Sequence, residues 1–164
     1  MSNYILEFFS NWDTYPKIVT TLLAMLPFTE LRGALPWGVF VGKMNLQSAF
    51  FYAVLGNYLI SIPLLLFLEP VSKYLSRYRM FDNFFKWLFM RTRKKSVQIE
   101  KYGFWGLVIF VGIPLPVTGA WTGSVAAFLF DLPRKKSFVA IFLGLLMSAT
   151  IVSVLIETGK MVVM

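Results

Sequence analysis

Two charged residues stand inside an otherwise uncharged apolar stretch, and their types make them the first candidates for chemistry. Glu30 and Arg32 are the only charges between Ile18 and Gly42. A charge at bilayer depth costs about 2.5–3.5 kcal/mol on insertion scales, so such a pair requires an explanation. Arginine holds phosphate or carboxylate with a planar fork of donors, and a poorly solvated glutamate takes up a proton more readily than an exposed one. We therefore expect Arg32 to contact an anionic substrate group and Glu30 to carry a coupling proton. A structural ion pair that closes the segment is the alternative.

A second apolar stretch, from Tyr102 to Phe130, carries no charge but is interrupted by the sequence GIPLPVTG. The prolines should stop one half-helix, and Thr118 should cap the next, whose free amides attract anions. We expect Thr118 and Gly119 to contact the substrate. Gly119 and Gly123 have the spacing that lets another helix approach closely, so tight packing alone is the alternative. The residues expected to shape the two interrupted stretches are Pro27, Gly33, Pro36, Pro114, Pro116 and Gly123.

The composition places these residues in a membrane protein. Hydrophobic residues make up 57% of the 164 residues and charged ones 15%, and the mean hydropathy is +0.67. A soluble domain of this size could not hide so much apolar surface. The net charge of +8 does not indicate nucleic acid, because nine of the sixteen basic residues lie between Lys73 and Lys101. Basic residues that flank apolar segments are typical of the cytoplasmic face of a membrane protein.

Side-chain types that the chain lacks limit the chemistry further. There is no cysteine and no histidine, which excludes disulfides, thiolate nucleophiles and imidazole bases, and no metal or cofactor is expected. Proton transfer would have to use the eight carboxylates. The apolar segments contain no serine–lysine or paired-carboxylate arrangement, so the chain is not expected to be an enzyme.

Two uncharged runs are long enough to cross a bilayer as helices. Met44–Leu68 has 25 residues and Ser137–Ile156 has 20. A crossing needs about 20 residues at about 1.5 Å per residue. Pro63 should kink the first of these helices, and Asn57 is a polar group that needs a partner inside the protein.

The two interrupted stretches are each expected to form two half-helices joined by irregular backbone. They are either kinked single spans or re-entrant hairpins that enter and leave the membrane on one side. Hairpins place Lys73–Lys101 and Arg134–Lys136 together on the cytoplasmic side, which explains three consecutive basic residues in a short loop. Hairpins are therefore favoured, in the cell membrane and with both termini outside.

The chain repeats one order of elements: a broken hairpin, a polar connection and a long helix. Interrupted segments at matching positions of two halves indicate inverted-topology repeats, as in transporters. We expect an all-α integral membrane fold in a single domain over residues 1–164. Its predicted parts are an amphipathic interfacial helix over 1–16, a first repeat over 17–70, a basic cytoplasmic connector over 71–101 and a second repeat over 102–158.

The strings LPFTELRGALPWGV and EKYGFWGLVIFVGIPLPVTGAWTGS resemble the motifs of a prokaryotic family, the small multidrug export proteins. More distantly, the chain is similar to the DedA (VTT-domain) superfamily of lipid translocases and scramblases. The resemblance implies two re-entrant hairpins packed head to head, each followed by a transmembrane helix. It matches Glu30, Arg32 and Pro36 to the first hairpin motif, and Pro114, Pro116, Thr118, Gly119 and Gly123 to the second. DedA proteins usually carry an arginine in the second motif too, and this chain has none there.

Together these features predict a transporter or translocase of the cytoplasmic membrane. Its expected partners are membrane lipids and an anionic or amphipathic, lipid-like substrate, held at a midplane site between the two hairpins. A homodimer is compatible with so small a bundle. The alternative is a non-transporting structural or regulatory membrane protein whose hairpins only pack.

Overall fold

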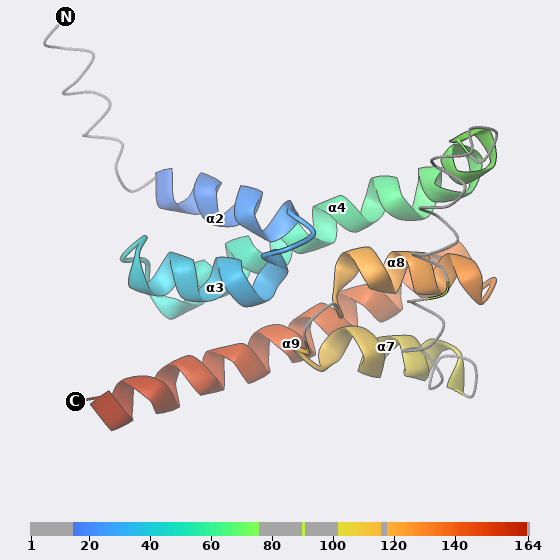
Figure 1. The fold of residues 1–164 in the computed structure, drawn as a ribbon. Coiled ribbons are helices and arrows are strands. Elements are labelled where there is room, and N and C mark those ends of the chain that lie inside the picture. Colours follow the sequence, from blue (N-terminus) through green and yellow to red (C-terminus); the bar gives the residue numbers. More distant parts are fainter. Residues whose placement is uncertain (1–14, 76–89, 91–101, 116–117, 164) are drawn as a thin grey trace, which may run out of the picture. The chain divides into compact units, whose positions relative to one another are not determined.

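The computed structural model describes residues 15–75, 90, 102–115 and 118–163, and in these ranges all regular structure is helical (Figure 1). The helices are α2 (Tyr15–Met25), α3 (Glu30–Phe40), α4 (Leu46–Leu75), α7 (Phe104–Gly112), α8 (Ala120–Leu129) and α9 (Arg134–Val163). The expected all-α class is therefore confirmed. Residues 1–14 of the predicted interfacial helix over 1–16, and most of the predicted connector over 71–101, lie outside the described residues.

The chain divides into two compact units. The first comprises residues 1–57 and 149–164, and the second comprises residues 58–148. The α2–α3 hairpin belongs to the first unit and the α7–α8 hairpin to the second. The long helices α4 and α9 each contribute one part to each unit.

Helices α4 and α9 contain the two predicted spans. Leu46–Leu68 and Arg134–Gly159, of 23 and 26 residues, are long and apolar enough to cross a membrane. At about 1.5 Å per residue, each exceeds the roughly 30 Å of a bilayer's hydrocarbon core. Helix α4 continues through Pro63 without a break, and the expected kink there stays a prediction.

The α2–α3 hairpin turns earlier than the sequence suggested. Its connection is only Leu26–Thr29, so Pro27 lies in the turn, while Glu30 already belongs to the first turn of α3. Pro36, which was expected to help shape the hairpin, lies inside α3, and that role stays a prediction. A proline inside a helix removes one backbone hydrogen bond, and Leu35 beside it is buried.

The α7–α8 hairpin has a longer, irregular connection. Helix α7 ends at Gly112, Ile113 is extended with φ −82° and ψ 117°, and α8 begins at Ala120. Pro114 lies at the start of this connection, as expected for a residue that cannot continue a helix. Pro116 lies outside the described residues.

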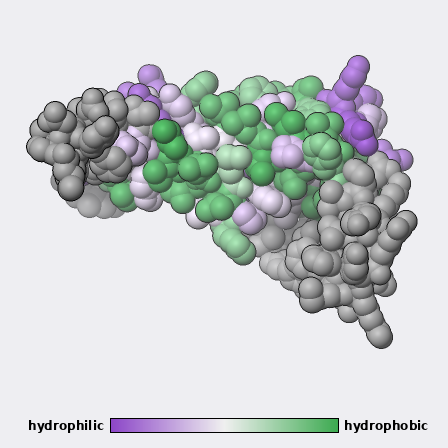
Figure 2. All heavy atoms as spheres, turned by 90° about the horizontal axis from the view of Figure 1, so that it is seen from above, coloured by the Kyte–Doolittle hydropathy of each residue, from purple (hydrophilic) through white to green (hydrophobic). Residues whose placement is uncertain are grey.

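Many of the buried side chains are small, and many of the exposed ones are large and apolar. On α2 the buried residues are Pro16, Thr20 and Ala24, whereas Ile18 and Leu22 are 51% and 57% exposed. The same contrast holds for α4 and α9. Their buried sets include Ala49, Ala53, Ser61, Ala140, Ser148 and Ala149, and their exposed sets include Phe51, Leu59, Phe67, Val139, Val154 and Leu155. Close helix packing through small residues, with large side chains turned to lipid, is the pattern of membrane bundles. Figure 2 shows the described part of this surface as predominantly hydrophobic.

In each unit, a glycine of the long helix lies against the first arm of the hairpin that precedes it. In the first unit, a Cβ added at Gly56 of α4 would collide with the backbone carbonyl of Thr21 on α2. In the second unit, a Cβ added at Gly144 of α9 would lie 2.9 Å from the carbonyl oxygen of Val108 on α7. Both halves thus join the first arm of a hairpin to the next long helix by the same kind of contact. The inverted relation between the halves stays a prediction.

Candidate functional site

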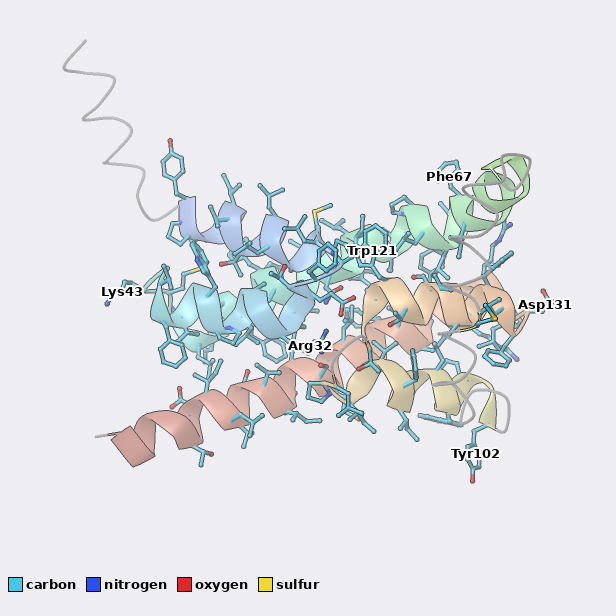
Figure 3. The ribbon with its side chains drawn as sticks, viewed as in Figure 1. Arg32, Lys43, Phe67, Tyr102, Trp121 and Asp131 are labelled. Atoms are coloured by element: carbon cyan, nitrogen blue, oxygen red, sulfur yellow. The ribbon has the colours of Figure 1, made fainter. Side chains whose placement is uncertain are left out.

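The first hairpin brings Glu30 and Arg32 together at the start of α3. Arg32 Nη2 lies 3.7 Å from Glu30 Oε2. The carboxylate is buried, at 3% exposure for the residue, whereas the Arg32 side chain retains 22%. Figure 3 labels Arg32 at this end of α3. Glu30 is the only charged residue that is buried within the described ranges.

Residues two apart do not face each other on a regular helix, so this contact needs a local departure from helical geometry. Glu30 provides it, because its φ is +46°, in the left-handed region that favours glycine. The N–H of Glu30 donates to the carbonyl of Leu26 at 3.0 Å, and the Thr29 hydroxyl donates to the carbonyl of Leu23. These bonds fix the turn around a strained residue. Backbone strain of this kind concentrates at functional sites.

The contact of Glu30 with Arg32 also explains how a carboxylate is tolerated here. An ionised carboxylate taken out of water is very costly unless it is paired. The guanidinium supplies the opposite charge, and the Arg32 side chain is partly exposed. Gly33 follows directly, and a Cβ at that position would lie 3.1 Å from Thr29 Cβ, so the first turn of α3 has room only for glycine without local adjustment.

Two further buried oxygens of the first unit have no partner among the described residues: Asn57 Oδ1 on α4 and Ser153 Oγ on α9. Asn57 is only 1% exposed. The sequence indicated that this carboxamide needs a partner inside the protein, and the described part of the chain does not provide one for its oxygen.

The connection of the second hairpin is held by Thr118, but not as expected. The Thr118 hydroxyl lies 2.7 Å from the carbonyl oxygen of Ile113 and 2.9 Å from that of Leu115, and it accepts from the Leu115 N–H at 3.2 Å. The prediction that Thr118 caps α8 is therefore wrong. Its hydroxyl binds backward to the loop, beside carbonyl oxygens that also accept from the backbone N–H groups of Leu115 and Thr118.

The residue that serves the start of α8 is Thr122, which the sequence reasoning missed. Gly119 occupies the cap position, and its N–H donates to Thr122 Oγ1 at 3.1 Å. A side-chain acceptor three residues after the cap is half of a capping box, and this spacing was the available signal. Substrate contacts at Thr118 and Gly119 stay predictions.

Gly123 lies where α8 meets its neighbours within the second unit. A Cβ added there would press on the Val111 side chain of α7 and would lie 3.7 Å from Cγ1 of Ile141 on α9. The close approach anticipated from the Gly119–Gly123 spacing occurs at this glycine. No group of three or more His, Cys, Asp or Glu side chains suited to a metal ion occurs within the described ranges.

Comparison with known proteins decides the family. The model of the family described as "Putative small multi-drug export protein" matches residues 30–151, which is about three quarters of the chain. This chain belongs to that family. No curated protein and no solved structure matches it.

The match to the small multi-drug export family begins at Glu30 and ends at residue 151. It covers all of α4 and the part of α9 up to residue 151. The family name denotes a transporter-type role, and the two membrane-length helices and the apolar outer surface agree with it. The chain is therefore a membrane protein of an export family. The similarity to the DedA superfamily stays an expectation.

Proposed function

We propose that this small multi-drug export protein is a translocase that moves an amphipathic or anionic, lipid-like substrate across the cytoplasmic membrane. The observation that carries the proposal is the buried Glu30 held 3.7 Å from a partly exposed Arg32 in the first unit. Insertion of both charges among apolar helices costs free energy. Ionisable residues inside a membrane commonly mark the pathway of a substrate or an ion.

Arg32 engages the anionic group of the substrate. Its planar guanidinium offers paired donors, which match the oxygens of a phosphate or a carboxylate. The Arg32 side chain is 22% exposed beside Glu30.

Glu30 carries a coupling proton in this proposal. The carboxylate is stabilised in its ionised form by Arg32, and an anion that binds to Arg32 competes for that stabilisation. Substrate binding therefore favours protonation of Glu30, and release of the substrate favours loss of the proton. The two events are coupled through direct contact, without a distant relay.

The proposed arrangement is two re-entrant hairpins of inverted topology. The support is the shared order of hairpin and long helix, together with the matching glycine contacts at Gly56 and Gly144. Helices α2, α3, α7 and α8 have 9 to 11 residues each, about half of what a span needs. In this arrangement both termini face outside. No catalytic step is proposed, and membrane lipids are the expected surroundings and the source of substrate.

Reconstitution in liposomes tests the proposal. Purified protein should move an anionic lipid or an amphipathic drug from one leaflet to the other, and Arg32→Gln should abolish this movement. Lys43→Gln is the matched control, because Lys43 is an exposed cation at the opposite end of the same hairpin. If a panel of lipids and drugs shows no movement above that of protein-free liposomes, the protein is a non-transporting membrane component and the proposal is wrong.

A further inference from the structure

A carboxamide within the first unit is buried without a donor for its oxygen. Asn57 is 1% exposed, and no described residue donates to Asn57 Oδ1. A buried acceptor without a partner carries the full penalty of lost hydration. Buried polar groups in folded proteins almost always have partners, so this oxygen marks a place where another molecule can donate.

The contacts of the first unit give the directions of its helices. Gly38 of α3 lies close to both other helices: a Cβ added there would lie 2.9 Å from Thr20 Oγ1 on α2 and 3.1 Å from Ala49 Cβ on α4. Farther along α4, Gly56 lies against the part of α2 that includes Ala24, close to the hairpin turn. Helix α4 therefore runs along α2 toward the turn, and α3 runs in the opposite direction.

These contacts and helix directions place Asn57 at the same level along the hairpin as Glu30. Glu30 precedes Gly38 by eight residues, and Asn57 follows Ala49 by eight residues. Because α3 and α4 run in opposite directions, both steps lead toward the turn, by about 12 Å at 1.5 Å per residue. The buried carboxylate and the buried carboxamide thus occupy one level of the first unit.

Resting on the proposed function, we propose that the anion held by Arg32 also carries an O–H or N–H group, and that this group donates to Asn57 Oδ1. A simple phosphate diester offers only acceptor oxygens, which suit Arg32 but leave the carboxamide oxygen unpartnered. A head group with a hydroxyl or amine beside its phosphate satisfies both. The ligand class is therefore a phosphate ester with a hydrogen-bond donor, which Arg32 recognises by charge and Asn57 by its donor.

Two lipids of equal charge separate this inference from simple anion binding. Phosphatidylglycerol carries hydroxyl donors in its head group, and phosphatidylmethanol carries none. The protein is reconstituted in phosphatidylcholine, whose head group has no N–H or O–H donor, and the movement of each anionic lipid between leaflets is measured. We expect phosphatidylglycerol to move about tenfold faster, because a site built around a donor rejects an analogue that leaves its buried acceptor unpaired.

Two variants of α4 assign that preference to Asn57. In Asn57→Leu the ratio of the two rates should fall to about one. In Ser61→Ala it should keep the wild-type value, because the buried Ser61 hydroxyl already donates to the Tyr58 carbonyl at 2.6 Å. A preference that survives in Asn57→Leu overturns the inference. If Asn57→Leu does not fold, the wild-type comparison still tests the inference, because equal rates for the two lipids overturn it.

Soluble esters distinguish a lipid ligand from a free phosphate ester. Thermal unfolding of the wild-type protein is compared in glycerol 3-phosphate and in methyl phosphate. Greater stabilisation by glycerol 3-phosphate shows that the head group suffices, whereas a preference confined to the lipids assigns a lipid ligand; both results support the inference. Equal rates for the two lipids in the wild-type protein overturn the inference but leave the proposed function standing. If neither lipid moves and no ligand stabilises the protein, the proposed function itself fails.

Discussion

The approach of Arg32 to Glu30 depends on the backbone of a single residue. Glu30 has a φ of +46°, a conformation that costs a residue other than glycine roughly 1–2 kcal/mol. The neighbouring turn fixes this conformation, since the Glu30 N–H is bonded to the Leu26 carbonyl at 3.0 Å. The strain therefore keeps a carboxylate 3.7 Å from a guanidinium only two residues away, where a regular helix would separate them.

Substitution of Arg32 distinguishes a ligand contact from a structural ion pair. Arg32→Lys keeps the charge but loses the planar fork, so we expect transport of an anionic substrate to weaken about tenfold or more while the protein still folds. Rates in liposomes and thermal unfolding in detergent give the two readouts. An Arg32→Lys protein as active as wild type would show that charge alone matters, and an Arg32→Gln protein that is unfolded would assign a structural role.

Substitution of Glu30 tests the coupling proton. Glu30→Gln resembles the protonated carboxyl in shape and charge, so it should retain exchange of substrate across the membrane. It should lose dependence on a proton gradient, because the variant can neither bind nor release the proton. Uptake is measured in liposomes with and without an imposed pH difference. A Glu30→Gln protein that still accumulates substrate in response to the gradient contradicts the role of this residue.

At the scale of the helices, alanine substitutions at two glycines of α9 should have opposite effects on stability. A Cβ at Gly144 would lie 2.7 Å from Val111 Cβ and 2.9 Å from the Val108 carbonyl oxygen of α7, whereas one at Gly159 would meet nothing within 4 Å. Gly144→Ala should therefore destabilise the protein by about 1–3 kcal/mol through overpacking. Gly159→Ala should stabilise it by up to about 1 kcal/mol through helix propensity. Thermal unfolding measures both, and a neutral Gly144→Ala would refute the close contact between α7 and α9.

The same scale shows how far the sequence predicts this fold. The spans in α4 and α9 follow from uncharged runs of sufficient length, because the hydrocarbon thickness sets a minimum that few other elements reach. The hairpin turns follow from their prolines. The position of Pro36 inside α3 did not follow, because tertiary packing can override the low helix propensity of a proline. Nor did the roles of Thr118 and Thr122, because each threonine can bond in either direction and only the folded loop selects one.

The sequence also predicted part of the candidate site. Charge in an apolar stretch was enough to single out Glu30 and Arg32, but not the left-handed φ that joins them. Asn57 was recognised only as a polar residue in need of a partner. Its depth relative to Glu30 depends on how α3 and α4 pack, which no local pattern encodes.

At the scale of the whole molecule, the surface indicates how the second unit meets a membrane. Tyr102 and Trp105 are 54% and 63% exposed where α7 begins, and α8 ends at the same end of this antiparallel hairpin (Figure 3). The exposed Arg134, Lys135 and Lys136 follow there, at the start of α9. Aromatic residues gather at membrane interfaces and basic residues on the cytoplasmic side, so this end of the unit should lie at the cytoplasmic surface.

Cysteine labelling tests the resulting topology without background, because the chain contains no cysteine. Single cysteines replace residues 43, 93, 135 and 160, and intact cells are treated with a membrane-impermeant thiol reagent. If both interrupted segments are re-entrant hairpins, positions 93 and 135 are protected together in the cytoplasm, while 43 and 160 are labelled. If the segments are kinked single spans, each crosses the membrane once, and positions 93 and 135 therefore fall on opposite faces. Permeabilised cells should label all four positions and so show that each cysteine is reachable. Labelling of only one of positions 93 and 135 would exclude the hairpin topology, and with it the proposed inverted repeat, whereas labelling of 93 and 135 with protection of 43 and 160 would reverse only the orientation of the termini.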